Sequence, residues 1–212
     1  MRKFRILVAD DHEIVRKGIA LILNETPDME VCGEAATGME VVESVQHQEW
    51  DAVVMDLRMP GLHGLELVKQ VHALRPRLPI LILTIEPEGI YARRLLHAGA
   101  AGYLTKDSLC TELVQAVRKI CTGGRYVSSG LVEQIAFNLD SDVDRPLHEQ
   151  LSDRELEVMR MLAAGMMPSA IAASLCISVK TVSTYRARIL SKMSLKTNAD
   201  LVKYGIREGL VS

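Results

Sequence analysis

The sequence predicts an α/β domain, built on a doubly wound five-stranded parallel sheet, followed by a small all-α helix-turn-helix domain. Strand-like and helix-like segments alternate five times before residue 122. Runs such as Ile-Leu-Ile-Leu at 80–83 are apolar at every position, which is typical of strands that helices cover on both faces of a parallel sheet. From residue 151 onwards the apolar residues recur only at helical spacing.

The first domain is expected to contain five strand–helix units. The strands lie at 5–9, 29–35, 52–56, 79–84 and 101–105, and the helices at 14–24, 39–48, 65–74, 90–98 and 109–121. The helix at 65–74 shows the helical period well, because Leu65, Val68, Val71 and Leu74 share one face. A doubly wound fold places its site outside the carboxyl ends of the strands. Function is therefore expected where the strands stop.

Between residues 123 and 148 the alternation breaks. Gly-Gly-Arg-Tyr-Val-Ser-Ser-Gly at 123–130 interrupts the pattern, and 131–139 is compatible with one more amphipathic helix. Residues 140–149 are polar and acidic and contain a proline, a composition typical of a solvated linker. The expected organisation is a first domain at 1–122, a linker with a candidate helix at 123–148, and a second domain at 149–212.

The second domain is predicted as four closely spaced helices. Their start signals are capping boxes at Ser152–Glu155 and Thr197–Asp200, an N-cap at Ser178 and a first-turn proline at Pro168. The helices extend from Ser152 to Gly165, over 168–175, over 178–193 and over 197–207. The third helix carries four cations and no acid up to residue 192, and buries Val182, Ile189 and Met193. A short helix, a tight turn and a cationic helix form a helix-turn-helix pattern.

Composition excludes several classes of protein. The chain has 212 residues and is 48% hydrophobic and 25% charged. Because no run reaches the ~18 apolar residues of a membrane helix, a cytoplasmic location without a membrane partner is expected. The four cysteines are far apart, which favours reduced thiols in the core, and the histidines lack the spacing of a zinc site.

The charge is unevenly distributed between the two parts. Residues 149–212 carry nine Lys or Arg against six Asp or Glu, a balance of +3, so the net charge of −2 leaves −5 for residues 1–148. A basic second domain favours a polyanionic partner.

Chemically suited residues stand at the predicted strand ends. Asp10 and Asp11 follow the first strand, Asp56 ends the third, and Thr84 and Lys106 close the next two. Three carboxylates at one edge repel each other, and a hard divalent cation such as Mg²⁺ relieves that repulsion. With a lysine and a hydroxyl beside it, Asp56 is suited to act as a nucleophile toward phosphorus. Taken singly, each acid is equally explained as a helix cap or a surface charge.

These motifs resemble bacterial two-component response regulators of the NarL/FixJ (LuxR-type) family, in which a CheY-like receiver domain precedes a helix-turn-helix output domain. The matching pieces are VADDHEIVRKG, AATG, VVMDLRMPGLHG, LILT, HAGAAGYLTKD, LSDRELEVMRMLAAG, ISVKTVSTYRARILSKM and GIREGL. The resemblance implies a phosphorylation-activated transcription regulator that binds promoter DNA. It also implies a sensor histidine kinase and RNA polymerase as protein partners, and a receiver that dephosphorylates itself without being a dedicated enzyme.

By the same resemblance, each residue at the strand ends has a role. Asp56 accepts the phosphoryl group, Lys106 pairs with it, and Thr84 moves to hydrogen-bond it. Mg²⁺ is held by Asp11, Asp56 and the main-chain carbonyl of Arg58, with Asp10 binding it directly or through water. Tyr103 occupies the position of an aromatic switch that follows Thr84, although plain packing explains it too.

The first domain departs from the family pattern in two places. Ile85 stands where the family usually has a small residue beside the phosphoryl pocket. Its branched side chain is expected to hinder access, and so to slow phosphoryl transfer, hydrolysis or both. Lys106 precedes Asp107 rather than the proline common in receivers. Neither departure removes a required group.

The resemblance assigns the DNA contacts mainly to the third helix of the second domain. Phosphates would be contacted by Lys180, Thr181, Tyr185, Arg188 and Lys196, and base edges approached by Ser183, Thr184 and Ala187. Because the base-facing side chains are small, methyl contacts, Arg186 or DNA shape are expected to contribute to sequence preference. Phosphate contacts make such binding salt-dependent.

The second domain also departs from the family pattern. The stretch 167–170, Met-Pro-Ser-Ala, replaces a polar segment and lacks its phosphate-contacting lysine, and Tyr185 stands where histidine is common. One output domain contacts one half-site, so a homodimer on paired half-sites is expected. The last helix resembles the family's dimer contact, although its apolar residues are equally explained as core: Leu201, Val202, Tyr204 and Ile206.

The sequence argues against two other classes of function and leaves a third open. A haloacid-dehalogenase-like phosphatase needs a second acid two residues after its nucleophile, where this chain has Arg58. A dinucleotide-binding module needs Gly-x-Gly-x-x-Gly in the first turn, which here presents acids instead. A regulator that works through protein contacts, with a vestigial output domain, stays open because of the altered stretch at 167–170.

Overall fold

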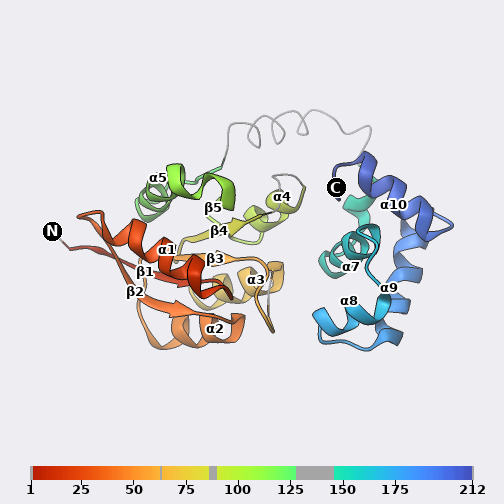
Figure 1. Cartoon of the computed structure of the whole chain (residues 1–212), viewed down its shortest axis with the longest axis horizontal. Helices are drawn as coiled ribbons and strands as arrows, with labels where there is room; N and C mark the ends of the chain where they lie inside the picture. The colour runs from red at the N-terminus through yellow and green to blue at the C-terminus, as the bar shows by residue number, and fades with distance from the viewer. Residues whose placement is uncertain (1, 63, 86–89, 128–145, 212) are drawn as a thin grey trace. The chain divides into compact units, whose positions relative to one another are not determined.

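The computed structural model of the chain describes residues 2–62, 64–85, 90–127 and 146–211. The chain divides between residues 137 and 138 into two compact units, an α/β unit and a helical unit (Figure 1). Among the described residues, no helix is long and apolar enough to cross a membrane.

The α/β unit contains the five-stranded parallel sheet that the sequence predicts, in the order β2-β1-β3-β4-β5. Its strands are β1 (Phe4–Ala9), β2 (Met29–Ala35), β3 (Ala52–Asp56), β4 (Ile80–Thr84) and β5 (Gly102–Thr105). All residues of β3 and β4 are buried, which explains why these two strands are apolar along nearly their whole length. The chain winds outward in both directions from β1 and β3, so the crevice of the doubly wound fold opens at their carboxyl ends.

Helices cover both faces of the sheet, as Figure 1 shows. They are α1 (Glu13–Asn24), α2 (Gly38–His47), α3 (Gly64–Leu74), α4 (Ile90–His97) and α5 (Leu109–Cys121), with a 3₁₀ turn, η1 (Lys106–Ser108), before α5. One core cluster joins α1 and α5 to the sheet through residues such as Ile19 and Val117. A second cluster joins α2, α3 and α4 to the opposite face through residues such as Val41, Val68 and Leu95.

One prediction of burial in α3 is wrong. Leu74, expected on the buried face of α3, is 38% exposed, whereas Leu67 is fully buried. The buried stripe is wider than expected, because α2 packs beside α3 and brings Gly38 against Leu67.

The cysteines are free, but they are not core residues as predicted. Cys32 lies on the edge strand β2, Cys110 in the first turn of α5, and Cys176 in a tight turn with a φ of 52°. All three are exposed, and only Cys121 is partly buried. Burial raises the pKa of the Cys121 thiol to about 12, so this thiol stays protonated and unreactive at neutral pH.

After α5 the chain returns to the sheet and covers the edge strand β5. The Tyr103 N–H donates to the Tyr126 carbonyl at 2.9 Å, and the Tyr126 N–H donates to the Ala101 carbonyl at 3.0 Å. This pairing extends the described part of the α/β unit to Val127, beyond the boundary predicted at residue 122. The helix predicted at 131–139 lies outside the described residues, as does most of the linker predicted at 123–148, and both stay predictions.

The described part of the helical unit contains first a 3₁₀ turn, η2 (Leu147–Gln150). It continues with α7 (Asp153–Ala163), α8 (Pro168–Ser174), α9 (Val179–Lys192) and α10 (Asn198–Arg207). The capping boxes of Ser152 and Thr197 are both formed, and the Ser178 hydroxyl accepts the Thr181 N–H at 3.0 Å, as predicted. The core face of α9 is also confirmed, because Val182, Ile189 and Met193 are fully buried.

Candidate functional site

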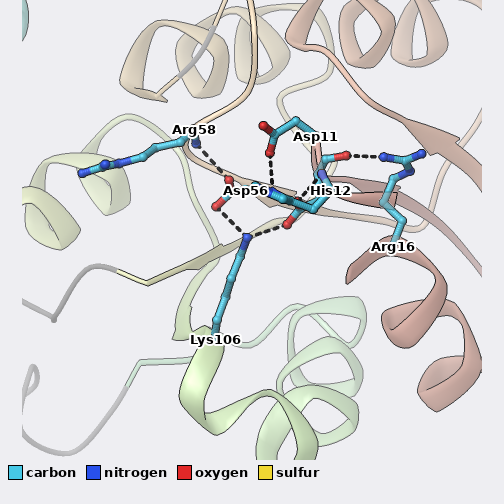
Figure 2. A network of polar contacts seen from close by, with 7 residues as sticks. Asp11, His12, Arg16, Asp56, Arg58 and Lys106 are labelled. Atoms are coloured by element: carbon cyan, nitrogen blue, oxygen red, sulfur yellow. Dashed lines mark hydrogen bonds and ion pairs between the residues drawn. The ribbon is translucent and has the colours of Figure 1, made fainter. Parts of the chain in front are cut away.

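Three charged residues from three strands meet at the carboxyl edge of the sheet. Asp10 follows β1, Asp56 ends β3 and Lys106 follows β5. The Lys106 Nζ lies 2.6 Å from Asp10 Oδ2 and 3.4 Å from Asp56 Oδ1, so one ammonium bridges two carboxylates (Figure 2). Because β1 and β3 are neighbours at the point where the strand order reverses, this cluster lies in the crevice where a doubly wound fold binds its ligands.

The cluster is buried and carries an excess of negative charge. Asp10 is 1% exposed and Asp56 is 5% exposed. Burial raises the pKa of Asp56 above its usual range; Lys106 acts against that rise and the charge of Asp10 adds to it. The Arg58 N–H also donates to Asp56 Oδ2 at 3.2 Å. One ammonium therefore serves two buried carboxylates, and a further positive charge would stabilise the ionised site.

The loop between β1 and α1 is fixed by two residues that the sequence analysis missed, His12 and Arg16. The His12 N–H donates to Asp10 Oδ1 at 2.9 Å, and its ring Nδ1 lies 2.8 Å from Asp11 Oδ1. Arg16 Nη1 donates to the Asp10 main-chain carbonyl at 2.7 Å (Figure 2). Both stand within six residues of Asp10, but only the fold shows that Arg16 reaches back to the loop.

The donor set fits a hard divalent cation. Among the described residues, one oxygen each from Asp10 and Asp11 and a ring nitrogen of His12 lie within 4.8 Å of one another. Asp56 joins this set through Lys106, which it shares with Asp10. Carboxylate oxygens in excess over neighbouring positive charge are what Mg²⁺ binds in proteins, usually together with water and phosphate.

The remaining predicted residues of the first domain lie along the same edge. Asp56 pairs with Leu83 across the sheet, so Thr84, which is fully buried, is the next residue of β4 toward the edge. Tyr103 pairs with Ile82 and is 1% exposed, a position that suits both the switch and the packing interpretation. Ile85 follows Thr84 and is 68% exposed.

In the helical unit, the residues predicted to bind DNA lie on the surface of α9 and just after it. Lys180, Ser183, Thr184, Ala187, Arg188 and Lys196 are exposed, and Thr181 and Tyr185 are half-buried. The Ser183 and Thr184 hydroxyls donate to the main-chain carbonyls of Val179 and Lys180, each at 3.0 Å. Because their protons are used within the helix, these side chains offer bases an acceptor oxygen and, for Thr184, a methyl group.

Two of the four cations of α9 are engaged inside the unit. Lys192 Nζ lies 2.6 Å from Glu155 Oε2, and Arg186 Nε donates to Asn198 Oδ1 at 2.6 Å.

The apolar residues of α10 divide between the two interpretations left open by the sequence, a dimer contact and the core of the unit. Leu201 and Tyr204 are buried, Val202 is half-buried and Ile206 is 61% exposed.

Comparison with protein families gives two matches. Residues 6–118 match the response regulator receiver domain. Residues 149–204 match the bacterial regulatory proteins of the luxR family. The first match covers most of the α/β unit, including its acidic edge, and the second covers α7 to α9 and most of α10.

Relatives of this chain match it over nearly its whole length. The response regulator GacA of Pseudomonas viridiflava is 36% identical over 208 residues, which are 98% of this chain and 97% of the relative. The response regulator UvrY of Escherichia coli K12 is 35% identical over 206 residues, 97% of this chain and 94% of the relative.

Solved structures of the response regulator RcsB are also similar. A structure of Salmonella typhimurium RcsB, described in terms of its conformational dynamism for DNA interaction, is 25% identical with a TM-score of 0.73, and the match covers 96% of this chain and 97% of RcsB. A structure of two RcsB dimers bound to two parallel DNAs is 25% identical with a TM-score of 0.60, and covers 96% and 98%. With its receiver edge, its helix-turn-helix and these relatives, the chain belongs to the transcriptional response regulators that join a receiver domain to a LuxR-type DNA-binding domain.

Proposed function

We propose that this response regulator accepts a phosphoryl group on Asp56 from a sensor histidine kinase, and then binds promoter DNA as a homodimer. The observation that carries the proposal is the bridge of Lys106 between Asp10 and Asp56, in the same chain as an exposed cationic helix. A regulator of this kind works where the promoters are, in the cytoplasm. RNA polymerase is the partner on which a promoter-bound regulator acts.

Phosphoryl transfer follows from the surroundings of Asp56. A carboxylate oxygen of Asp56 attacks the phosphorus of a phosphohistidine, the P–N bond breaks, and the imidazole leaves with its electron pair. Lys106, already 3.4 Å from Asp56, then pairs with a phosphoryl oxygen. Asp10, Asp11, Asp56 and the main-chain carbonyl of Arg58 would hold Mg²⁺, whose charge would offset the negative charge of the transferring group.

The phosphoryl group changes the electrostatics of the edge. It adds about −1.5 to −2 charges and strong acceptor oxygens, which compete with Asp10 for Lys106. The Thr84 hydroxyl, at the end of β4, donates a hydrogen bond to the phosphoryl group. Tyr103, on the neighbouring strand, changes its position in response to Thr84. This rearrangement biases an equilibrium between two conformations of the receiver.

DNA binding is proposed for the exposed face of α9. Lys180, Thr181, Tyr185, Arg188 and Lys196 contact phosphates, while Ser183, Thr184 and Ala187 approach base edges. The dimers seen on DNA for the related RcsB support a homodimer on paired half-sites. The exposed Ile206 of α10 is available for a contact between two copies, whereas Leu201 and Tyr204 belong to the core.

Phosphorylation of the full chain by ³²P-labelled acetyl phosphate with Mg²⁺ tests the first step. The unchanged chain is expected to retain label that alkali releases, as an acyl phosphate does. Asp56→Asn is expected to retain none, and EDTA to prevent labelling. Asp107→Asn is the matched control, because this exposed acid stands next to Lys106. Equal labelling of Asp56→Asn and the unchanged chain would contradict the assignment.

A further inference from the structure

Lys192 is a cation of the recognition helix α9, but it is held by a buried acid. Its Nζ lies 2.6 Å from Glu155 Oε2, and Glu155 is 3% exposed. The same carboxylate oxygen accepts the Ser152 N–H at 2.8 Å and the Ser152 hydroxyl at 2.9 Å. Burial raises the pKa of Glu155, but Lys192 and Ser152 together bring it below its usual value, so the acid is ionised at neutral pH.

Arg154, the neighbour of Glu155, connects α7 to α8, the first helix of the helix-turn-helix. Arg154 Nη2 donates to the main-chain carbonyl of Leu175, at the end of α8, at 3.0 Å. The first turn of α7 therefore binds the last residue of α9 through Glu155 and the end of α8 through Arg154. These two contacts fix both helices of the motif on α7.

Lys192 is also badly placed to bind DNA in this arrangement. It is the last residue of α9, about 18 Å along the helix axis from Lys180. The N-terminal part of a recognition helix is the part that approaches base edges. The Lys192 side chain is 43% exposed, so its place at the C-terminal end of α9, and not burial, is what disfavours a contact with DNA. A phosphate that drew the Lys192 Nζ away from Glu155 would also leave this buried acid with only its Ser152 hydrogen bonds, which is unfavourable.

We infer that Lys192 is a positioning residue, which holds the recognition helix on α7 through Glu155 and does not itself contact DNA. The inference rests on the proposed function, because it concerns DNA binding by α9. It leaves Lys180 and Arg188 as the phosphate-contacting cations of this helix. Lys192 is exposed as they are, so the distinction rests on its ion pair with Glu155 and on its position at the end of α9. Arg188 is the matched comparison for Lys192, since it stands one turn earlier on the same helix.

The unchanged chain first selects a duplex from a pool of random sequences about 30 base pairs long, which is enough for two half-sites. The test then measures binding of the full chain to this duplex in the presence of acetyl phosphate and Mg²⁺. Affinity is measured over a series of salt concentrations for Lys192→Met, Glu155→Gln, the double variant and Arg188→Met. Each phosphate contact contributes about 0.9 to the slope of log affinity against log salt. Circular dichroism and thermal unfolding confirm that each variant is folded.

A positioning role predicts that Lys192→Met and Glu155→Gln each weaken binding about tenfold, within the coupling energies of contacting residues, and leave the salt slope unchanged. The double variant is then no weaker than either single one, and Lys192→Arg restores binding. Arg188→Met instead lowers the slope by about 0.9.

Two results would overturn the inference: a slope lowered by about 0.9 in Lys192→Met, or tighter binding by Glu155→Gln, which would mean that Lys192 had been released onto DNA. Should Lys192→Met not fold, Glu155→Gln still decides between the two roles, because a positioning role predicts weaker binding and a direct phosphate contact predicts equal or tighter binding. An unchanged chain that selects no duplex contradicts the proposed function instead.

Discussion

Replacing Lys106 with methionine removes the ammonium that Asp10 and Asp56 share, while keeping the apolar part of the side chain. The variant leaves two carboxylates, 1% and 5% exposed, without the positive charge that bridges them. Lys106→Met is therefore expected to destabilise the α/β unit. It is also expected to bind Mg²⁺ more tightly than the unchanged chain, because one positive charge fewer competes with the metal.

The expected loss of stability in Lys106→Met follows from the distances between the Lys106 Nζ and the two carboxylates. At an effective dielectric constant of about 20, unit charges at the two observed separations attract by about 6 and about 5 kcal/mol. The cost of desolvating the three groups offsets most of this attraction, and removing one partner of a buried ion pair costs about 3–5 kcal/mol. Since the Lys106 side chain is 17% exposed, we expect the lower end, about 3 kcal/mol at neutral pH.

The loss of stability in Lys106→Met is expected to grow as the pH rises. Burial raises the pKa of Asp56 in the folded chain, and losing Lys106 raises it further. An acid whose pKa is higher folded than unfolded contributes stability that is present at low pH and is lost as pH rises through the folded pKa. The destabilisation of Lys106→Met, measured against the unchanged chain, is therefore larger at about pH 8 than at about pH 5.

Urea unfolding monitored by fluorescence measures this effect directly. Trp50 is the only tryptophan, it is 9% exposed, and it belongs to the α/β unit. Lys17→Met is the matched control, because Lys17 lies 2.9 Å from Glu34 but is 60% exposed, and a surface pair contributes only about 0–1 kcal/mol. Equal losses for the two variants, or a Lys106→Met loss that does not change with pH, would refute the reasoning.

Three further substitutions give distinct outcomes. Ile85→Ala is expected to speed phosphorylation by acetyl phosphate, hydrolysis of the acyl phosphate or both, because it opens access to Asp56; unchanged rates in a ³²P time course would refute the hindrance. Thr84→Ala is expected to be labelled on Asp56 but to show no gain in DNA affinity on labelling, and a full gain would remove Thr84 from the switch. Tyr204→Phe loses the contact of its hydroxyl with His148 Nδ1 at 2.6 Å, in the core of the helical unit. It is expected to cost about 1–2 kcal/mol in thermal unfolding followed by circular dichroism, and an unchanged melting temperature would show that the contact contributes nothing.

The α/β fold could be predicted because local patterns and global fold agree. β2, β3 and α5 have the predicted bounds, and the other strands and helices of this unit differ at their ends by one residue. The edge cluster could also be predicted, since parallel strands that end in Asp10, Asp56 and Lys106 bring those residues to one edge whatever the details of packing.

Contacts made across the fold could not be predicted from spacing. Lys192 and Glu155 are 37 residues apart, and Arg186 and Asn198 are 12 apart. The sequence alone assigns no role to Lys192 and only a contribution to sequence preference to Arg186, because spacing along the chain does not show that both bind residues of other helices. Predictions of burial were wrong where the packing of neighbouring elements decides it. The packing of α2 beside α3 buries Leu67 as well, and the cysteines lie on an edge strand or near helix ends.

Control of DNA binding by Asp56 is the central claim, and a genome-wide map of DNA occupancy tests it most directly. Cells that contain the unchanged chain are compared with cells that contain Asp56→Ala, at equal protein levels. The unchanged chain is expected to occupy discrete sites near promoters, and Asp56→Ala to lose most of that occupancy. Equal occupancy by both chains would contradict control by phosphorylation, and an absence of discrete sites would contradict promoter recognition by α9.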